Sequence, residues 1–238
     1  GGRDVTAHYR RLDVRELPTT LQPTLQRADA CETAFCTGTA MFRRRDRGIE
    51  TQTDIAVSTD DDVELRRVRI TNGAGTGRLL DVTSYAEIVL APAATDAAHP
   101  AFNKLFVQTE ILPELCAILC THRARAPDDP APWMFHLLTA TGPTDADLTF
   151  ETDRMQFVGR GRSTADPQAL DAGAQLSGSA GPVLDPVAAI RCRVTLNAGA
   201  GAVIDLVTGI ADTRDARMAL IHKYHDRHAA DYVLTAAP

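Results

Sequence analysis

Apolar and polar residues alternate strictly along several segments of this sequence, and this period of two constrains the fold more than any other feature. In residues 189–196 one side carries Ile190, Cys192, Val194 and Leu196, and the other carries Arg191, Arg193 and Thr195. Residues 80–90, 105–111 and 133–137 repeat the pattern. Such alternation is typical of a strand with one face on a core and one face in water. We therefore expect long cationic side chains such as Arg191 to lie over a solvated face.

Turn residues separate the alternating runs. Asp60-Asp61-Asp62 lies between residues 55–59 and 63–70, and Asn72-Gly73 follows at once. Residues 197–199 join the strand at 189–196 to a run at 202–210, which predicts a hairpin. In residues 63–70 the apolar face switches along the run, which indicates either a bulge or burial on both faces. Many strands with regular turns predict an all-β sandwich or barrel.

The composition excludes several classes of protein. A net charge of −6 with acids interspersed among the arginines argues against a binder of nucleic acid. No apolar run approaches the roughly 18 residues of a membrane span, and the first residues lack the apolar core of a signal peptide. The five cysteines show no disulfide or zinc spacing, so we expect reduced, mostly buried thiols in a cytoplasmic domain.

One helix is predicted near the end of the chain. Asp212 is a candidate N-cap with Asp215 three residues later, and residues 216–224 carry an apolar stripe at helical spacing. Two long loops, 91–101 and 159–186, are rich in proline or glycine. Loops of this length on a β scaffold often carry function.

Short motifs favour structural roles. The glycines of residues 72–77 precede a strand and not a helix, so we interpret them as a connector and not as a dinucleotide loop. We interpret Asp60-Asp61-Asp62 as a solvated turn. The histidines at 222, 225 and 228 would spread around a helix and would not converge on one metal ion. Glu87, Glu110 and Glu151 fit either a groove or a solvated sheet face. We assign no catalytic residue, no metal site and no cofactor.

Two segments are candidate binding sites. In residues 99–110 a strand would place Lys104, Phe106, Gln108 and Glu110 on the face opposite Leu105, Val107 and Thr109. An aromatic ring flanked by charged and amide groups suits a sugar, and it suits a contact between domains equally. In residues 152–162 two glycines and two arginines suit either an anion or salt bridges to an adjoining domain. The candidate residues are His99, Phe102, Lys104, Phe106, Gln108, Glu110, Arg160 and Arg162.

The same segments carry a family resemblance. Residues 63–72, 80–92, 99–110, 151–162, 176–178 and 184–186 appear in the order seen in the amino-terminal β-domain of glycoside phosphorylases of the cellobiose phosphorylase type (glycosyltransferase family 36, glycoside hydrolase family 94). They are most similar to the phosphorylase-like region of cyclic β-1,2-glucan synthases. The resemblance covers residues 37 to 224 approximately.

The resemblance implies a galactose mutarotase-like β-supersandwich with a C-terminal helix that leads to an (α/α)6 barrel absent from this chain. The expected divisions are an N-terminal extension with the first strand region (1–36), the β-supersandwich (37–211) and a linker helix (212–238). The expected partners are that barrel, a β-glucan oligosaccharide and a second copy in a homodimer. The parent would be a hexosyltransferase of the inner membrane.

Three functions are compatible with these observations. The first is a non-catalytic module that supports and partly lines the carbohydrate site and the dimer interface of a larger enzyme. The alternatives are a self-sufficient carbohydrate-binding module and a pure dimerisation and scaffold domain. The aromatic content of 5%, with one Trp and four Tyr, is low for an independent sugar binder and favours the supporting role.

Overall fold

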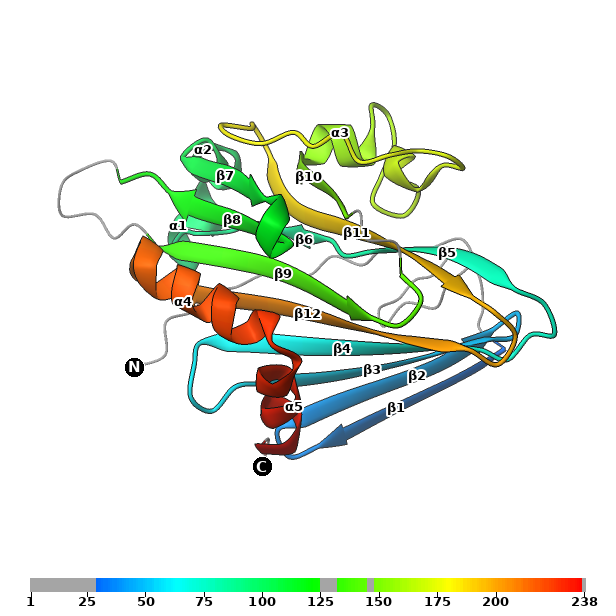
Figure 1. Ribbon diagram of the computed structural model, residues 1–238. Helices are drawn as coiled ribbons and strands as arrows, with labels where there is room; N and C mark the ends of the chain where they lie inside the picture. Colours follow the sequence, from blue (N-terminus) through cyan, green and yellow to red (C-terminus); the bar gives the residue numbers. More distant parts are fainter. Residues whose placement is uncertain (1–28, 125–131, 145–147, 237–238) are drawn as a thin grey trace.

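The chain folds into two antiparallel sheets. The computed structural model describes residues 29–124, 132–144 and 148–236. The larger sheet has eight strands in the order β1 (Ala30–Cys36), β2 (Thr39–Asp46), β3 (Ile49–Val57), β4 (Val63–Asn72), β12 (Gly201–Ala211), β9 (Trp133–Thr141), β8 (Ala117–His122) and β7 (Val107–Leu112). The smaller sheet has the order β10 (Thr149–Asp153), β11 (Pro186–Leu196) and β5 (Arg78–Thr83), and β6 (Ala86–Glu87) pairs with β11. This confirms the predicted all-β sandwich (Figure 1).

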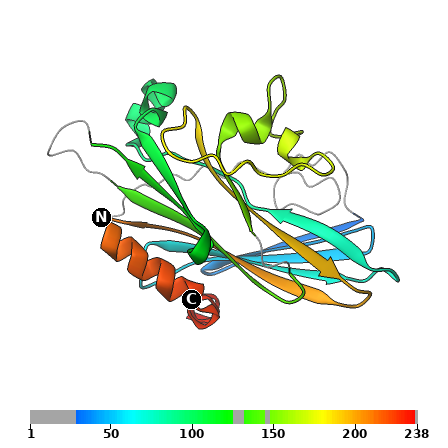
Figure 2. The same ribbon diagram turned by 45° about the horizontal axis from the view of Figure 1, so that its top comes forward.

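Five helices accompany the sheets in the described ranges, where the sequence predicted one. They are α1 (Ala93–Ala98), α2 (Pro100–Lys104), α3 (Arg154–Val158), α4 (Arg214–His225) and α5 (Arg227–Ala236), with 3-10 turns at Pro113–Leu115 and Gln168–Leu170. Both views place α4 and α5 on one face of the larger sheet and the smaller sheet on the other (Figures 1 and 2). The N-cap of α4 is Thr213 and not Asp212, because the Thr213 side chain accepts a hydrogen bond from the Ala216 amide.

The main core lies between the two sheets. The predicted inward residues of β11, namely Ile190, Cys192, Val194 and Leu196, are all fully buried there. They pack with Leu80 and Ile88 from the segment at 80–90 and with Ile204 of the larger sheet. The predicted inward set of β11 is therefore confirmed, whereas along 80–90 the alternation is broken, because Thr83 and Tyr85 of the outward set are buried as well.

A second apolar layer lies between the larger sheet and the two C-terminal helices. Leu65 and Phe135 of the sheet pack with Ile221, Tyr224 and Val233 of the helices. Strand β4 is consequently buried on both faces, on the helix side at Leu65 and on the sandwich side at Ile70. Its register with β3 and β12 runs without a shift, so the switch in its apolar face reflects two-sided burial and not a bulge.

The predicted hairpin between β11 and β12 is wrong. β11 pairs with β10 and β5 in the smaller sheet, whereas β12 pairs with β4 and β9 in the larger one. Residues 72–77 likewise cross between sheets from β4 to β5, as the connector prediction required. The buried Asn72 amide joins both crossings, because it donates to the carbonyls of Thr76 and Leu196 at 2.9 and 3.0 Å.

Two further expectations need correction. Strand β7 begins at Val107, so Lys104 belongs to α2 and Phe106 to the link between them, and neither lies on the strand. All five cysteines are free, as expected, but only Cys120 and Cys192 are buried. Cys31 and Cys36 are exposed on β1 because that strand lies at the edge of the sheet.

Candidate functional site

The two segments singled out in the sequence meet at one carboxylate. Lys104 Nζ, at the end of α2, lies 2.5 Å from Asp185 Oδ1. Arg154 Nη1, at the start of α3, lies 3.7 Å from Asp185 Oδ2, and the Arg154 amide donates to the Asp185 carbonyl at 2.9 Å. Asp185 stands just before β11, so a single acidic residue joins α2 to α3 across the top of the smaller sheet.

A second carboxylate extends this network inward. Arg154 Nε lies 3.2 Å from Glu87 Oε1, and the Tyr85 hydroxyl donates to the same oxygen at 3.2 Å. Burial raises the pKa of Tyr85, and the Glu87 charge raises it further. The phenol therefore stays protonated and acts as a donor.

Exposed apolar side chains lie close in the sequence to the residues of the charged network. Phe102, Met155 and Leu184 are 50%, 51% and 76% exposed, and each is within two residues of a member of the network. We call this set the Asp185 surface; it consists of Phe102, Lys104, Arg154, Met155, Leu184 and Asp185. Exposed apolar groups beside fixed polar groups are typical of a contact surface.

The phenylalanines differ in what they can offer a ligand. The Phe106 ring packs between Phe102 and His122, with ring centres 5.1 and 5.6 Å away, and the Arg123 guanidinium carbon lies 5.7 Å from its centre. Phe106 therefore supports Phe102, which is the ring with a free face. His99 is exposed at the junction of α1 and α2.

Gln108 and Glu110 lie away from the Asp185 surface. Both are exposed on β7, and Glu110 Oε1 lies 3.3 Å from Arg214 Nη2 at the start of α4. Alternation along β7 places Gln108 on the same helix-facing side. Glu110 thus joins the contacts of the C-terminal helices, and Gln108 lies exposed two residues before it.

The two candidate arginines of the long loop have different surroundings. Arg162 binds Asp171 through Nη1 at 2.5 Å and Asp166 through Nη2 at 3.0 Å. Both of its ion pairs therefore lie within the long loop. Arg160 is exposed and has no ion pair within the part of the chain that the structure describes. Of the two, Arg160 is the cation open to an outside anion.

Two buried charges hold the long loop from below, and the sequence did not single out either role. Arg191, expected over a solvated face, is 7% exposed and donates to the carbonyls of Ala169 and Ala174 at 2.5 and 2.7 Å. Glu151 is 1% exposed; its carboxylate accepts hydrogen bonds from the amides of Thr152 and Asp153 and from the amide and hydroxyl of Ser177. Glu151 therefore lies neither in a groove nor on a solvated face.

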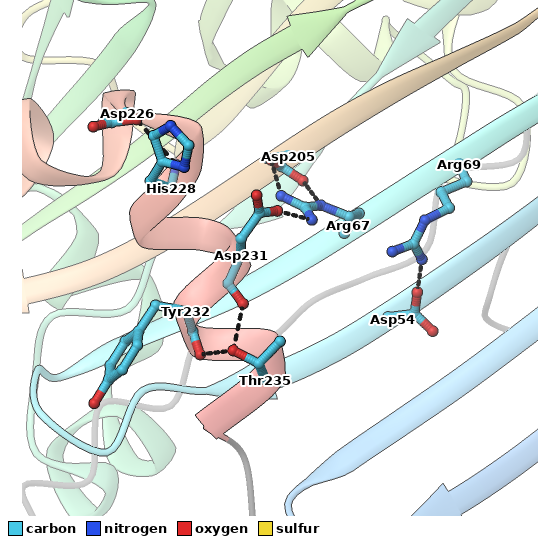
Figure 3. A network of polar contacts seen from close by, with 9 residues as sticks. All are labelled: Asp54, Arg67, Arg69, Asp205, Asp226, His228, Asp231, Tyr232 and Thr235. Atoms are coloured by element: carbon cyan, nitrogen blue, oxygen red, sulfur yellow. Dashed lines mark hydrogen bonds and ion pairs between the residues drawn. The ribbon is translucent and has the colours of Figure 1, made fainter.

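The C-terminal helices are anchored by a second polar network (Figure 3). Arg67 on β4 contacts Asp205 on β12 through two hydrogen bonds of 2.7 and 2.8 Å, and it also binds Asp231 on α5. Arg67 and Asp205 are each about 5% exposed, so this is a buried pair with one partly exposed partner. Figure 3 shows the Arg67 side chain between the strand carboxylate and the helix carboxylate.

The aspartate triplet at 60–62 belongs to the same anchor. Asp61 Oδ2 lies 2.6 Å from Lys223 Nζ and accepts a hydrogen bond of 2.7 Å from the Tyr224 hydroxyl, both on α4. The predicted turn is confirmed between β3 and β4, and its central carboxylate binds a helix.

Neither a metal cluster nor a membrane-spanning helix is found in the described ranges. Residues 29–124, 132–144 and 148–236 hold no group of three or more His, Cys, Asp or Glu placed to bind a metal ion. No helix within these ranges is long and apolar enough to cross a membrane.

The chain is similar to several known proteins. The model of the glycosyl hydrolase 94 supersandwich domain matches residues 17–227. The cyclic β-(1,2)-glucan synthase NdvB of Rhizobium meliloti (strain 1021) is 33% identical over 218 residues, which cover 92% of this chain and 8% of that protein. Among solved structures, a heparinase III has a TM-score of 0.41 at 5% identity, over 78% of this chain and 22% of its own. A polysaccharide lyase has a TM-score of 0.41 at 14% identity, over 74% of this chain and 22% of its own.

Proposed function

Since the chain belongs to the glycosyl hydrolase 94 supersandwich domain family, we propose that it is a non-catalytic module of a cyclic β-1,2-glucan synthase-like enzyme. In this role it supports the catalytic part, contributes a carbohydrate-contacting surface and takes part in self-association. Its relative is a much longer protein, of which this chain spans 8%. The module would thus act beside a downstream helical domain.

The proposed contact with carbohydrate rests on the Asp185 surface. A sugar ring offers an apolar face and a rim of hydroxyls, so it binds best where a free aromatic face lies beside fixed hydrogen-bonding groups. Phe102 supplies such a face, and Lys104, two residues later on α2, is fixed by its ion pair with Asp185, which Arg154 also binds. The loop below is held by Arg191 and Glu151, so the surface is already ordered without ligand.

The surroundings of the acidic residues favour a structural role for their carboxylates over a catalytic one. A general acid or nucleophile needs a carboxyl group that can reach substrate. Glu151 uses both oxygens on backbone and serine donors, while Glu87 and Asp185 are each bound by arginine or lysine. These engagements favour a structural role for the three acids nearest the Asp185 surface.

The polar anchor of α4 and α5 supports the proposed link to a following domain. The contacts of Arg67 with Asp231 and of Asp61 with Lys223 hold both helices on the larger sheet. A chain that continues from α5 would therefore leave the module in a defined direction.

Calorimetric titration with β-1,2-glucan oligosaccharides tests the carbohydrate contact. We expect weak, saturable binding that falls at least about tenfold in Phe102→Ala, the size expected when one stacking contact is lost. Tyr232→Ala is the matched control, because Tyr232 is 53% exposed but lies on α5. Equal loss in both variants, or no loss in Phe102→Ala, would reject the Asp185 surface as the contact.

An activity assay tests the non-catalytic role separately. The chain with β-1,2-glucan and phosphate should release no sugar phosphate above the rate of a heat-denatured sample. Sustained turnover that survives repeated purification would overturn the proposal.

A self-sufficient carbohydrate-binding module is the second candidate, and the exposed ring of Phe102 favours it. It requires micromolar or tighter affinity for glucan in the isolated chain. Millimolar affinity would instead match a surface that completes a site built mainly by another domain.

A further inference from the structure

Strand β1 is an open edge of the larger sheet. It pairs with β2 on one side, and in the described part of the chain its residues have no hydrogen-bond partner on the other side. Six of its seven residues are exposed, and the seventh, Ala34, is half-buried. The opposite edge of the same sheet, β7, is closed at Thr109, which exchanges backbone hydrogen bonds of 3.1 and 2.9 Å with Gly181.

β1 also lacks the features that usually protect an edge strand. Natural edges are blunted by lysines, prolines, bulges or very short length, because an unpaired row of amides and carbonyls recruits another strand. β1 has seven residues with an unbroken register to β2, and Glu32 is its single charge. This edge is therefore competent to accept an added strand.

An exposed aromatic ring marks the same edge. Phe35 is 76% exposed and contacts Phe42 of β2 edge-on, with ring centres 5.9 Å apart. Its outer face meets no described residue of the chain. Burying a phenylalanine of this exposure stabilises an interface by about 1.5 kcal/mol or more, so the ring points to a strand that covers it.

We propose that β1 pairs antiparallel with β1 of a second copy of this chain, around a two-fold axis perpendicular to the sheet. This inference rests on the proposed self-association and names its surface. Directly opposed residues in such a pair must lie on the same face, so the axis passes through a single residue of β1. An axis at Glu32 would oppose two carboxylates and is disfavoured.

The self-complementary arrangements are centred on Thr33 or Ala34. With the axis at Ala34, Phe35 lies opposite Thr33 of the partner subunit and diagonal to the partner's Phe35. The two rings of each subunit then form a continuous apolar strip across the axis, and the two Glu32 side chains stay apart. The chemistry of β1 thus fits a second copy of itself, because one register buries the exposed ring and separates the charges.

Light scattering over a concentration series tests the pairing. The chain should dimerise at micromolar concentration, and Phe35→Lys should weaken the dimer at least about tenfold, because it places a charge on the edge. Val57→Lys is the control, since Val57 is 61% exposed on β3 but lies away from the edge. Circular dichroism verifies that each variant is folded.

Cysteine crosslinking locates the axis. In a Cys31→Ser and Cys36→Ser background, Thr33→Cys or Ala34→Cys should give a disulfide dimer, because only residues at the axis oppose their own copies at about 5 Å between Cβ atoms. Thr59→Cys, in the turn before β4, should give none. A monomer at all concentrations overturns the inference, and so does a dimer that neither Phe35→Lys nor the cysteines affect.

A dimer that these variants do not affect would reject β1 as the interface, while the proposed self-association would remain. Glucan titration of the Phe35→Lys variant separates this inference from the proposed carbohydrate contact. Unchanged affinity in a monomeric Phe35→Lys variant supports both, because the Asp185 surface lies on another part of the molecule. Loss of glucan binding in Phe35→Lys, with Phe102→Ala unaffected, would overturn the Asp185 surface and not the edge pairing.

Discussion

The guanidinium carbon of Arg217 on α4 lies 4.2 Å from the centre of the Trp133 ring, and none of its three nitrogens has a hydrogen-bond partner among the residues that the structure describes. Arg217 is fully buried. Burial lowers the pKa of its guanidinium, and the nearby Arg214 charge lowers it further. The ring contact offsets only part of the cost of removing this charge from water.

Arg217→Met should therefore leave the protein as stable as before or raise its free energy of unfolding by about 1 kcal/mol or more, because an apolar side chain needs no acceptor. The methionine keeps a favourable contact with the Trp133 ring. Urea denaturation followed by the fluorescence of Trp133, the one tryptophan of the chain, measures the effect. Arg214→Met, at an exposed site on the same helix, is the control. A loss above about 2 kcal/mol in Arg217→Met would show that the guanidinium has an acceptor in solution.

The two carboxylates bound to Arg67 should contribute unequally to the free energy of unfolding. Asp205→Asn removes the buried partner and should cost about 3 kcal/mol, because it leaves Arg67 poorly paired away from water. Asp231→Asn removes a partner whose side chain is 44% exposed, so it should cost under about 1 kcal/mol. Hydrogen exchange should show faster exchange in α5 for Asp231→Asn and in the whole sheet for Asp205→Asn. The reverse order of stability would contradict this network.

Acidification should weaken the fold through His136 at the centre of the sandwich. Its Nδ1 lies 2.9 Å from Thr208 Oγ1 and its Nε2 lies 2.8 Å from Ser84 Oγ. Burial lowers the pKa of His136 to about 4, with a smaller effect of the Arg66 charge. The unfolded chain therefore takes up a proton more readily than the folded one.

The stability from His136 is complete above its unfolded pKa of about 6.5 and is lost as pH falls toward 4, by roughly 3 kcal/mol in total. His136→Gln should flatten the pH dependence of unfolding between pH 6.5 and 5, whatever its effect at pH 8. An identical slope in the variant would show that His136 is not the titrating group. Asp231, whose pKa is lowered chiefly by its hydrogen bond with Arg67, acts in a lower window, below about pH 4.

Glu151→Gln should loosen the long loop without unfolding the sandwich. The amide nitrogen cannot accept the hydrogen bonds that one carboxylate oxygen receives, which should cost about 2 kcal/mol. Limited trypsin digestion should cut after the exposed Arg160 several times faster than in the unaltered protein. Glu110→Gln, at an exposed carboxylate, should digest at the original rate.

The period of two predicted the strands well because it reports which side of each strand is buried. It could not tell which sheet a strand joins, so β11 and β12 were paired wrongly. It also placed Arg191 in water, because the carbonyls that bind Arg191 come from Ala169 and Ala174 of a loop without regular pattern. Short helices such as α2 have too few residues to show a helical period.

The second C-terminal helix had a signal in the sequence. Asp226 accepts a hydrogen bond from the amide of His228 and so begins α5, and a cap residue after Tyr224 would have predicted a second helix. The convergence of Lys104 and Arg154 on Asp185 had no local signal, because the three residues belong to three separate segments. Only the fold brings them together.

The turn at Asp61 holds the C-terminal end of α4 against the larger sheet. Lys223 and Tyr224 are held to this one carboxylate, and α5 starts three residues later. Deleting or inserting one residue between β3 and β4 would move this carboxylate away from Lys223 and Tyr224, while Arg67 and the apolar layer would still hold α5 on the sheet. In a longer protein, the length of this turn would therefore help to set how α4 and α5 lead from the sandwich to whatever follows them.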